Sequence, residues 1–354
     1  MKIAVGMSGG VDSAVTAALL KREGHEVIGI HLRLYKDGSD DSKHWLDRSC
    51  CKIGLARHVV NQLKIPLHVI DVQDSFNSAV IDDFKREYQN GRTPNPCVLC
   101  NEKIKFGTLI EMGKALGAER VATGHYARIQ YDKITQLFQL LIPSDLVKDQ
   151  TYFLYRLKQN QLPTILFPLA DMEKKEIYKI AEELDFPYED VLESQEVCFV
   201  NQGDYRTFLR EEGGILSEPG DFISTGGERI GEHQGIPFYT VGQRRGLGVA
   251  LGRRQFVIQI KPEQNQIVLG DESELLQKEI LVRSLNWISG HPLSGSLVAA
   301  VKIRYKSREA RARIEAVGED LARVIFLEPQ RGVASGQSAV FYRDSMVLGG
   351  GVIQ

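Results

Sequence analysis

The sequence lacks any apolar run close to the length of about eighteen residues that a membrane-spanning helix needs. It also lacks a basic and then apolar leader, because Met1 is followed at once by a short apolar stretch. Neither sign of charge is in excess: 44 Lys and Arg stand against 46 Asp and Glu, a net charge of −2. We therefore expect a cytoplasmic protein without a membrane partner, whose contact with a nucleic acid would need a local basic face.

Cysteine is scarce, with five residues in a chain of 354. An odd number without an export signal argues against a disulfide framework and favours thiols, metal ligands or catalytic groups. No second Cys-x-x-Cys accompanies the first, so a zinc site has little support. With 43% hydrophobic and 25% charged residues, the chain is long enough for two or three domains, each with its own core.

A glycine-rich bend lies between Lys2–Val5, an apolar run typical of a buried strand, and Ala14–Leu20, which predicts a helix. Its glycines leave backbone N–H groups bare beside the positive end of the helix dipole, which favours a bound phosphate. The lysine of the common phosphate loop is missing. The stretch Ser8–Ser13 instead resembles the pyrophosphate loop of ATP pyrophosphatases, enzymes that join AMP to an oxygen. The alternative is a glycine turn capped by Asp12 or Ser13.

Further apolar runs at 26–32, 67–72 and 120–128 alternate with helical patterns. This order predicts an α/β domain with an open, doubly wound parallel sheet that binds its ligand at the carboxyl ends of the strands. Residues 36–48 are expected to form a surface loop. Glycines become frequent after residue 201, and residues 255–354 read as short strands of a β-barrel. We predict a catalytic domain at 1–200, a central glycine-rich domain at 201–270 and a C-terminal β-barrel at 271–354.

Cys97 and Cys100 form a Cys-x-x-Cys pair at the start of a helix-compatible run, after two prolines at 94 and 96. The helix dipole and the nearby lysines at 103 and 105 should favour their thiolates. A redox pair, half of a metal site, and a nucleophile with a helper all remain open. Cys198 lies in an apolar, strand-like run, where composition predicts a core position. Cys50 and Cys51, side by side at a helix start, are expected to be structural thiols.

Three stretches carry the residue types that contact nucleic acids. Lys148–Leu154 mixes a cation, an amide and aromatics, and Arg244 and Arg245 stand among glycines. A basic stripe on one barrel face would consist of Lys302, Arg304, Lys306, Arg308, Arg311 and Arg313. This stripe favours RNA over the alternative of a merely solvated face. His125, at the end of a strand, fits a nucleotide-facing position and a buried, hydrogen-bonded one equally well.

Taken together, these motifs resemble the family of tRNA-specific 2-thiouridylases, bacterial enzymes that place sulfur on the wobble uridine of tRNA. The resemblance runs along the whole chain and includes Gly6–Ser13, Thr93–Asn101, Ala122–Tyr126, Lys148–Gln150, Ser194–Phe199, Tyr239–Gly248 and Val301–Tyr305. It implies an adenine-nucleotide alpha-hydrolase-like domain that uses ATP, with Mg²⁺, to adenylate the 2-carbonyl oxygen of uracil. The implied ATP-binding residues are Gly6, Met7, Ser8, Gly9, Gly10, Val11, Asp12, Ser13, Leu32 and Gly124.

The resemblance also implies roles for three thiols. Cys198 would carry the sulfur as a persulfide and Cys100 would be the nucleophile, whereas Cys97 stands where many relatives carry an aspartate that assists the base chemistry. In an alternative mechanism, Cys97, Cys100 and Cys198 would hold a [4Fe-4S] cluster that binds sulfide at an open iron.

The implied partners are tRNA and a sulfur-donor protein, either a cysteine desulfurase or a relay protein, and the enzyme is expected to be a monomer. The residues implied in tRNA contact are Lys148, Asp149, Gln150, Arg304 and Tyr305. Two rival functions remain: an enzyme that adenylates a small acceptor before amidation, and an RNA-binding or redox-sensing module that uses no ATP.

Overall fold

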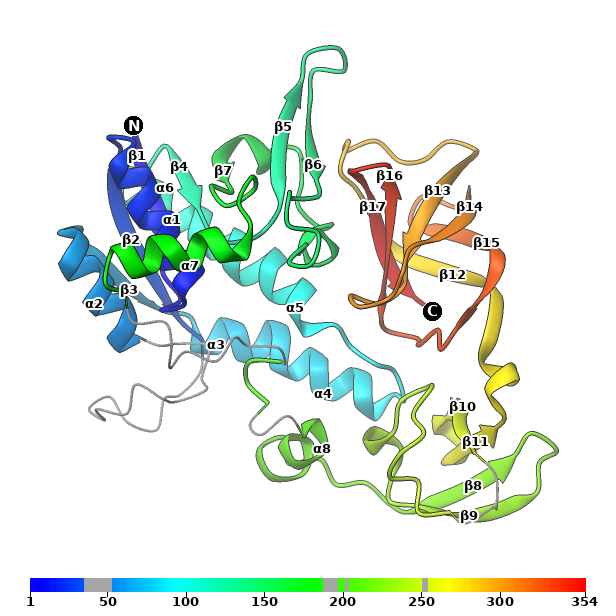
Figure 1. The fold of residues 1–354 in the computed structure, drawn as a ribbon. Helices are drawn as coiled ribbons and strands as arrows, with labels where there is room; N and C mark the ends of the chain where they lie inside the picture. Colours follow the sequence, from blue (N-terminus) through cyan, green and yellow to red (C-terminus); the bar gives the residue numbers. More distant parts are fainter. Residues whose placement is uncertain (35–52, 187–196, 201–203, 250–253) are drawn as a thin grey trace.

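The computed structural model describes residues 1–34, 53–186, 197–200, 204–249 and 254–354 (Figure 1). The predicted loop at 36–48, together with Cys50 and Cys51, lies outside these residues. Three sheets organise the described chain: one of five strands, one of four and one of eight. None of the described helices is long and apolar enough to span a bilayer.

The five-stranded sheet is parallel, with the strand order β3-β2-β1-β4-β7. The chain moves outward from β1 through β2 to β3 and then returns to β4 on the other side of β1. The switch point of this doubly wound sheet therefore lies between β1 and β4, where such folds bind their ligands. The strands are β1 (Lys2–Gly6), β2 (Glu26–Arg33), β3 (Leu67–Asp71), β4 (Arg120–Ala122) and β7 (Ile165–Leu166).

Helices cover both faces of this sheet because successive strand side chains point in opposite directions. Ile3 and Val5 pack with residues of α1 (Val11–Arg22), α2 (Ile53–Leu63) and α7 (Lys174–Glu183). Ala4, between them in sequence, packs against the opposite helical layer, in η2 (Cys100–Thr108) and α6 (Leu109–Ala115). The predicted doubly wound domain is confirmed.

A helical segment joins this sheet to the rest of the molecule and brings the cysteine pair into the core. It comprises α3 (Gln73–Phe76), η1 (Asn77–Ile81), α4 (Asp82–Gln89), α5 (Pro96–Leu99) and then η2. Pro96 occupies the first turn of α5, where its missing N–H costs nothing. Cys100 begins η2, a π-helical stretch in which the hydrogen-bond spacing widens.

The central four-stranded sheet has the order β10-β11-β8-β9. Its strands are β8 (Gly220–Ser224), β9 (Arg229–His233), β10 (Phe256–Lys261) and β11 (Gln266–Gly270). The strands at 256–270, whose pattern alone reads like that of the barrel strands, belong to this sheet, because β11 pairs with β8. Short helical turns surround this sheet: α8 (Tyr205–Thr207), η6 (Phe208–Glu212), η7 (Ile236–Phe238), η8 (Pro262–Gln264) and η9 (Glu272–Leu275).

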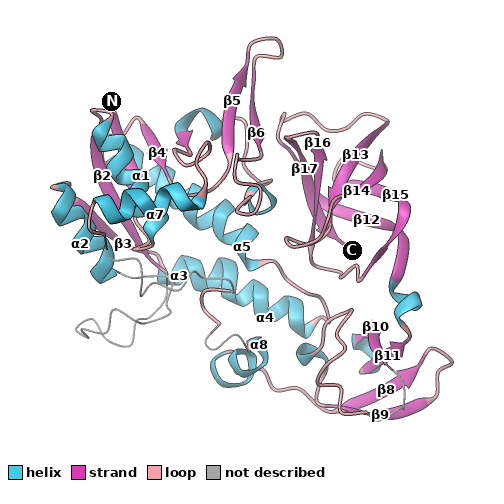
Figure 2. Cartoon of the chain, in the orientation of Figure 1, coloured by secondary structure: helices cyan, strands magenta, loops and turns pink. Residues whose placement is uncertain are grey.

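The predicted C-terminal β-barrel is also confirmed, and it is closed (Figure 2). Antiparallel pairing runs β12-β15-β14-β13-β16-β17, and β17 pairs again with β12. The strands are β12 (Leu276–Trp287), β13 (Ser296–Lys302), β14 (Ala310–Ala316), β15 (Leu321–Arg331), β16 (Ser338–Arg343) and β17 (Met346–Ile353).

A hairpin from the N-terminal part extends the barrel sheet. It consists of β5 (Arg128–Asp132) and β6 (Leu137–Leu141), and β6 pairs with the first residues of β17. The turns η3 (Thr151–Phe153) and η4 (Leu162–Thr164) follow it. The sequence patterns predicted neither this hairpin nor β12.

Candidate active site

The glycine bend lies at the switch point of the parallel sheet, between the end of β1 and the start of α1 (Figure 1). Gly9 has a φ of +83°, a left-handed conformation that glycine adopts without strain. Gly10 caps α1 in an extended conformation without a side-chain hydrogen bond. The bend thus ends on the positive end of a twelve-residue helix, the geometry predicted for a phosphate site.

Hydrogen bonds between residues close in sequence fix the shape of this bend. The Ser8 hydroxyl accepts the N–H of Gly10 at 3.3 Å and bonds the Ser13 hydroxyl at 3.2 Å. The Ser13 hydroxyl also donates to the Gly10 carbonyl at 2.8 Å. Both serines of the motif therefore hold the backbone in one conformation.

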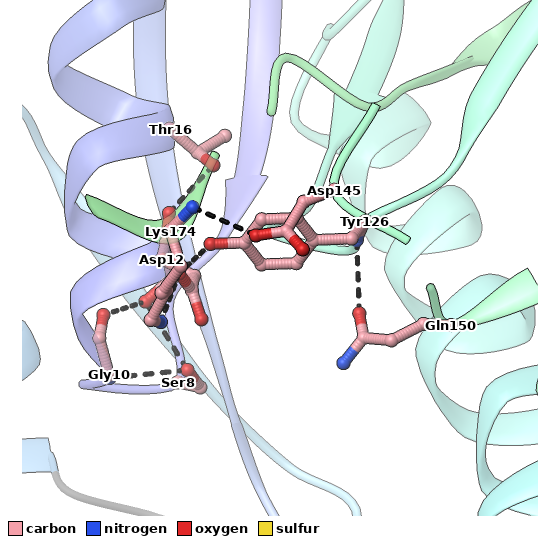
Figure 3. Close-up of polar contacts among 9 residues, drawn as sticks. Ser8, Gly10, Asp12, Thr16, Tyr126, Asp145, Gln150 and Lys174 are labelled. Carbon is pink, nitrogen blue, oxygen red and sulfur yellow. Dashed lines mark hydrogen bonds and ion pairs between the residues drawn. The ribbon is translucent and has the colours of Figure 1, made fainter. Parts of the chain in front are cut away.

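Asp12 receives two strong hydrogen bonds on the same carboxylate oxygen (Figure 3). Lys174 Nζ, from the first residue of α7, donates to Asp12 Oδ1 at 2.7 Å, and the Tyr126 hydroxyl donates at 2.8 Å. Lys174 is 9% exposed and Tyr126 is 2% exposed. A lysine from a distant helix thus offsets the negative charge of Asp12 beside the bend.

Sequence reasoning missed Lys174 and gave Tyr126 no role. Lys174 is separated from Asp12 by 162 residues and begins a helix whose pattern is otherwise ordinary. Its one local signal is a lysine at a helix start, where the dipole disfavours a cation. Such a residue needs an acidic partner, and here the partner is Asp12.

Gly124, predicted to lie near the adenosine, follows β4 directly against the bend. A Cβ atom at this position would lie 2.7 Å from the Asp12 carbonyl carbon and 2.9 Å from the Ser13 nitrogen. Real Cβ atoms do not approach backbone so closely, so only glycine fits. Leu32, near the end of β2, packs against two cores. One contains Cys100, and the other contains Phe106 and Leu109 of the η2–α6 layer.

The predicted tRNA-contacting residues 148–150 belong to a segment, here called the 145–150 loop, that touches the same network. Gln150 Oε1 accepts the N–H of Tyr126 at 3.0 Å, and the Gln150 N–H donates to the Tyr126 carbonyl at 3.0 Å. Asp145 Oδ2 accepts the N–H of Lys174 at 3.0 Å. Asp149 is buried, accepts hydrogen bonds from Thr151 and faces Lys302 at 3.6 Å.

The three described cysteines that were predicted to act together lie in one region. Cys100 is buried in the core cluster that also contains Phe199, and Cys198 packs against this cluster. Cys97 and Cys198 are close enough for their charges to interact. Each of the three is a thiol and none belongs to a disulfide. Within the described ranges, no group of three or more His, Cys, Asp or Glu side chains could hold a metal ion.

Two expectations about these cysteines are wrong. Burial, with a smaller contribution from the Cys198 thiol, raises the pKa of Cys97 to about 11, and the opposing effect of Lys105 is weaker than the two together. Cys97 is therefore a thiol at neutral pH, because desolvation outweighs the helix dipole and the lysine. Residues 197–200 form a turn and not a strand, and Cys198 is half-buried in it.

His125 packs in an aromatic environment and not in a charged one. Its ring centroid lies 5.5 Å from that of Phe106 and 6.0 Å from that of Phe167, and Nδ1 bonds the Thr123 hydroxyl at 2.8 Å. Burial, with a smaller contribution from Lys105, lowers the pKa of His125 well below its usual value. Of the two alternatives for His125, these contacts favour the buried, hydrogen-bonded one, with a neutral imidazole.

The basic residues of the barrel divide into two groups. Arg311 and Arg313 are exposed on β14, alternating with buried neighbours, while Arg304 is exposed in the turn before that strand. Lys302 instead faces Asp149 and lies over the Tyr342 ring at 5.9 Å. Tyr305 packs against Phe153 at a centroid distance of 4.5 Å. The continuous stripe predicted from the sequence is thus interrupted at Lys302.

The parallel sheet and its serine-glycine bend define a nucleotide-binding protein of the ATP-pyrophosphatase type. Residues 1–202 match the family described as tRNA methyl transferase HUP domain. Residues 206–271 match the tRNA methyl transferase PRC-barrel domain, and residues 277–353 match the aminomethyltransferase beta-barrel domain. The chain belongs to the tRNA-specific 2-thiouridylase family.

Whole-length relatives establish this membership. The chain is 43% identical over 356 residues to tRNA-specific 2-thiouridylase MnmA of Acetivibrio thermocellus, covering 100% of this chain and 99% of that protein. It is 42% identical over 356 residues to the MnmA of Clostridioides difficile, covering 100% and 98%. A crystal structure of a 4-thiouridine synthetase–RNA complex with bound ATP is 16% identical, with a TM-score of 0.36 over 54% of this chain and 42% of that chain. At this TM-score the likeness carries no argument about function.

Proposed function

We propose that this protein catalyses the ATP-dependent 2-thiolation of the wobble uridine of tRNA. The observation that carries the proposal is the gathering of three thiols: Cys100 lies in a core against which Cys198 and Leu32, at the end of β2, both pack, and Cys97 interacts with Cys198. A bend at the carboxyl end of β1 and thiols in a core that meets the carboxyl end of β2 suit a reaction that first activates an oxygen and then replaces it with sulfur.

In the proposed first step, ATP lies with its phosphates on the bend 8–13, accompanied by Mg²⁺. The 2-carbonyl oxygen of uracil attacks the α-phosphorus, a P–O bond forms, and pyrophosphate leaves. The positive end of α1, which begins after Gly10, favours the charge that develops on the phosphates. Lys174 limits repulsion from Asp12.

In the proposed second step, the terminal sulfur of a persulfide on Cys198 attacks C2 of the base. The C2–O bond breaks and AMP leaves with the bonding electrons. The Cys100 thiolate then attacks the Cys198 sulfur, which leaves the sulfur on the base and joins Cys100 to Cys198 in a disulfide. An external thiol reduces this disulfide, and a cysteine desulfurase or relay protein restores the persulfide.

The protonated Cys97 does not act as the base in this scheme, because its raised pKa keeps it neutral. Its place beside Cys198 suits a hydrogen-bond donor to the persulfide. The iron–sulfur alternative gains no support from the arrangement of the described side chains.

We further propose that the three domains 1–200, 201–270 and 271–354 have separate roles. The first carries out the chemistry, and the second and third contact tRNA. We also propose that the protein acts as a monomer in the cytoplasm.

Substituting Cys100→Ser and Cys198→Ser separately tests the proposal. Each change should abolish thiolation while leaving tRNA affinity within about twofold, because serine forms neither a persulfide nor a disulfide. Thiolated nucleoside is measured by mass spectrometry after tRNA digestion, and binding by filter retention. Cys51→Ser serves as the matched control and should retain activity.

Two outcomes would contradict the proposal. Thiolation retained in either variant would remove that cysteine from the scheme. Pyrophosphate release by the wild type at full rate without tRNA would favour adenylation of a small acceptor, and normal function after Ser8→Ala would favour a module that uses no ATP.

A further inference from the structure

The 145–150 loop holds both of the donors that bind the Asp12 carboxylate. Asp145 accepts the backbone N–H of Lys174, the residue whose Nζ reaches Asp12. Gln150 bonds the backbone of Tyr126 in both directions, and the hydroxyl of that tyrosine reaches the same oxygen of Asp12. Figure 3 shows Lys174 and Tyr126 meeting at Asp12, with Gln150 on the far side of Tyr126.

The outer side of this loop is open to a large partner. Leu146 is 67% exposed and Val147 is 86% exposed. The amide nitrogen of Gln150 points away from Tyr126, and the described residues give it no hydrogen-bond partner. The Gln150 side chain therefore binds the backbone of Tyr126 through its oxygen, and its amide N–H groups can donate to a ligand.

The loop is also held from the barrel side. The carboxylate of Asp149 faces Lys302 of β13, and Thr151 bonds both Asp149 and the Tyr342 hydroxyl of β16. A displacement of the loop relative to the barrel would thus change the positions of Lys174 and Tyr126 together. Because hydrogen bonds to a charged group are strong and directional, the Asp12 carboxylate would respond to small shifts of its two donors.

We propose that Tyr126 is a positioning residue through which tRNA binding at Gln150 sets the Asp12 carboxylate for the ATP reaction. The inference rests on the proposed function, since it assigns the coupling between the two substrates of that reaction. Docking of a tRNA group on the Gln150 amide tightens the loop, and the Tyr126 hydroxyl transmits this change to Asp12. ATP is then activated chiefly when tRNA is present.

The test compares pyrophosphate release with and without tRNA in wild type, Tyr126→Phe, Gln150→Ala and the double variant. The measured quantity is the stimulation factor, the ratio of the two rates at saturating ATP. Tyr126→Phe removes only a hydroxyl and should lower this factor by about tenfold or more, the usual effect of losing a hydrogen bond to a charged group. Gln150→Ala should lower it similarly, and the double variant should be no worse than the more affected single variant.

Tyr131→Phe is the matched control, because Tyr131 is 46% exposed on β5 and distant in the network from Asp12. It should keep the wild-type stimulation factor. A purely structural role for Tyr126 would change both rates equally and leave the ratio unaltered. Thermal melting of each variant checks that the fold is retained.

Two results would overturn the inference while leaving the proposed function intact. One is a stimulation factor in Tyr126→Phe equal to that of the wild type. The other is a double variant whose loss of stimulation is the sum, in free energy, of the losses in the two single variants. Absence of tRNA-dependent pyrophosphate release in the wild type would overturn the proposed function itself, and the coupling with it. Non-additive losses confined to the stimulation factor are the supporting result.

Discussion

At the scale of single residues, burial decides the chemistry of the thiol and imidazole groups near the site. His125 and Cys97 are both kept neutral by desolvation, although Lys105 interacts with each. Both groups are therefore neutral at neutral pH even though a cationic lysine lies close enough to affect each of them.

The raised pKa of Cys97 predicts a pH dependence of its alkylation. A thiol with a pKa of about 11 holds its proton through neutral pH, so its thiolate fraction should rise about tenfold per pH unit between pH 7 and 9 without levelling off. Iodoacetamide labelling of the Cys97 peptide, followed by mass spectrometry, measures this rise. In guanidinium the same peptide should label faster and level off near the usual cysteine pKa of about 8.5. Equal profiles in the folded and unfolded chain would contradict the prediction.

At the scale of elements, the bend and Gly124, the second residue after β4, are closely packed. Gly124→Ala would put a methyl group 2.7 Å from the Asp12 carbonyl carbon, so the bend must shift. We expect ATP affinity to fall by about tenfold or more, the effect of overpacking by 1–3 kcal/mol. Isothermal titration calorimetry with ATP measures the loss.

Gly54→Ala is the matched control for this substitution. Gly54 lies in α2, where a Cβ atom would meet nothing within 4 Å. Its ATP affinity should equal that of the wild type, and alanine should favour the helix. Unchanged ATP affinity in Gly124→Ala would show that the bend moves freely or does not bind the nucleotide.

Local sequence patterns predict the individual elements but not which distant elements contact one another. The order of β1, the bend and α1 follows from apolar runs and glycines, and the resemblance of Ser8–Ser13 to a pyrophosphate loop predicted the ATP-pyrophosphatase type. The contact between Lys174 and Asp12 could not be predicted, because nothing in the sequence near either residue specifies a partner 162 positions away. The assignment of β10 and β11 to the central sheet likewise depends on which strand β11 pairs with, and alternation does not encode this.

At the scale of the whole molecule, side-chain amides form hydrogen bonds between the barrel and the N-terminal part of the chain. Asn286 of β12 donates to the carbonyls of Tyr155 at 2.6 Å and Leu157 at 3.1 Å. Asn286→Ala leaves both carbonyls without this donor and should lower the free energy of unfolding by about 1–3 kcal/mol. Urea denaturation followed by tryptophan fluorescence measures the change.

Asn61→Ala, on the exposed side of α2, is the control and should shift the unfolding free energy by no more than about 0.5 kcal/mol. A loss in Asn286→Ala no larger than that of the control would mean that the two parts are held together by other contacts. A second unfolding transition in Asn286→Ala would instead show that the barrel has begun to unfold separately.

The pairing of β6 with β17 has a consequence for dissecting the protein. A fragment that stops at residue 200 would keep the β5–β6 hairpin but lose the strand that covers its edge. Open strand edges recruit other chains, so such a fragment should self-associate, and the isolated barrel should present the complementary edge on β17. Mixing the two fragments offers a route to rebuilding the enzyme from separately expressed halves.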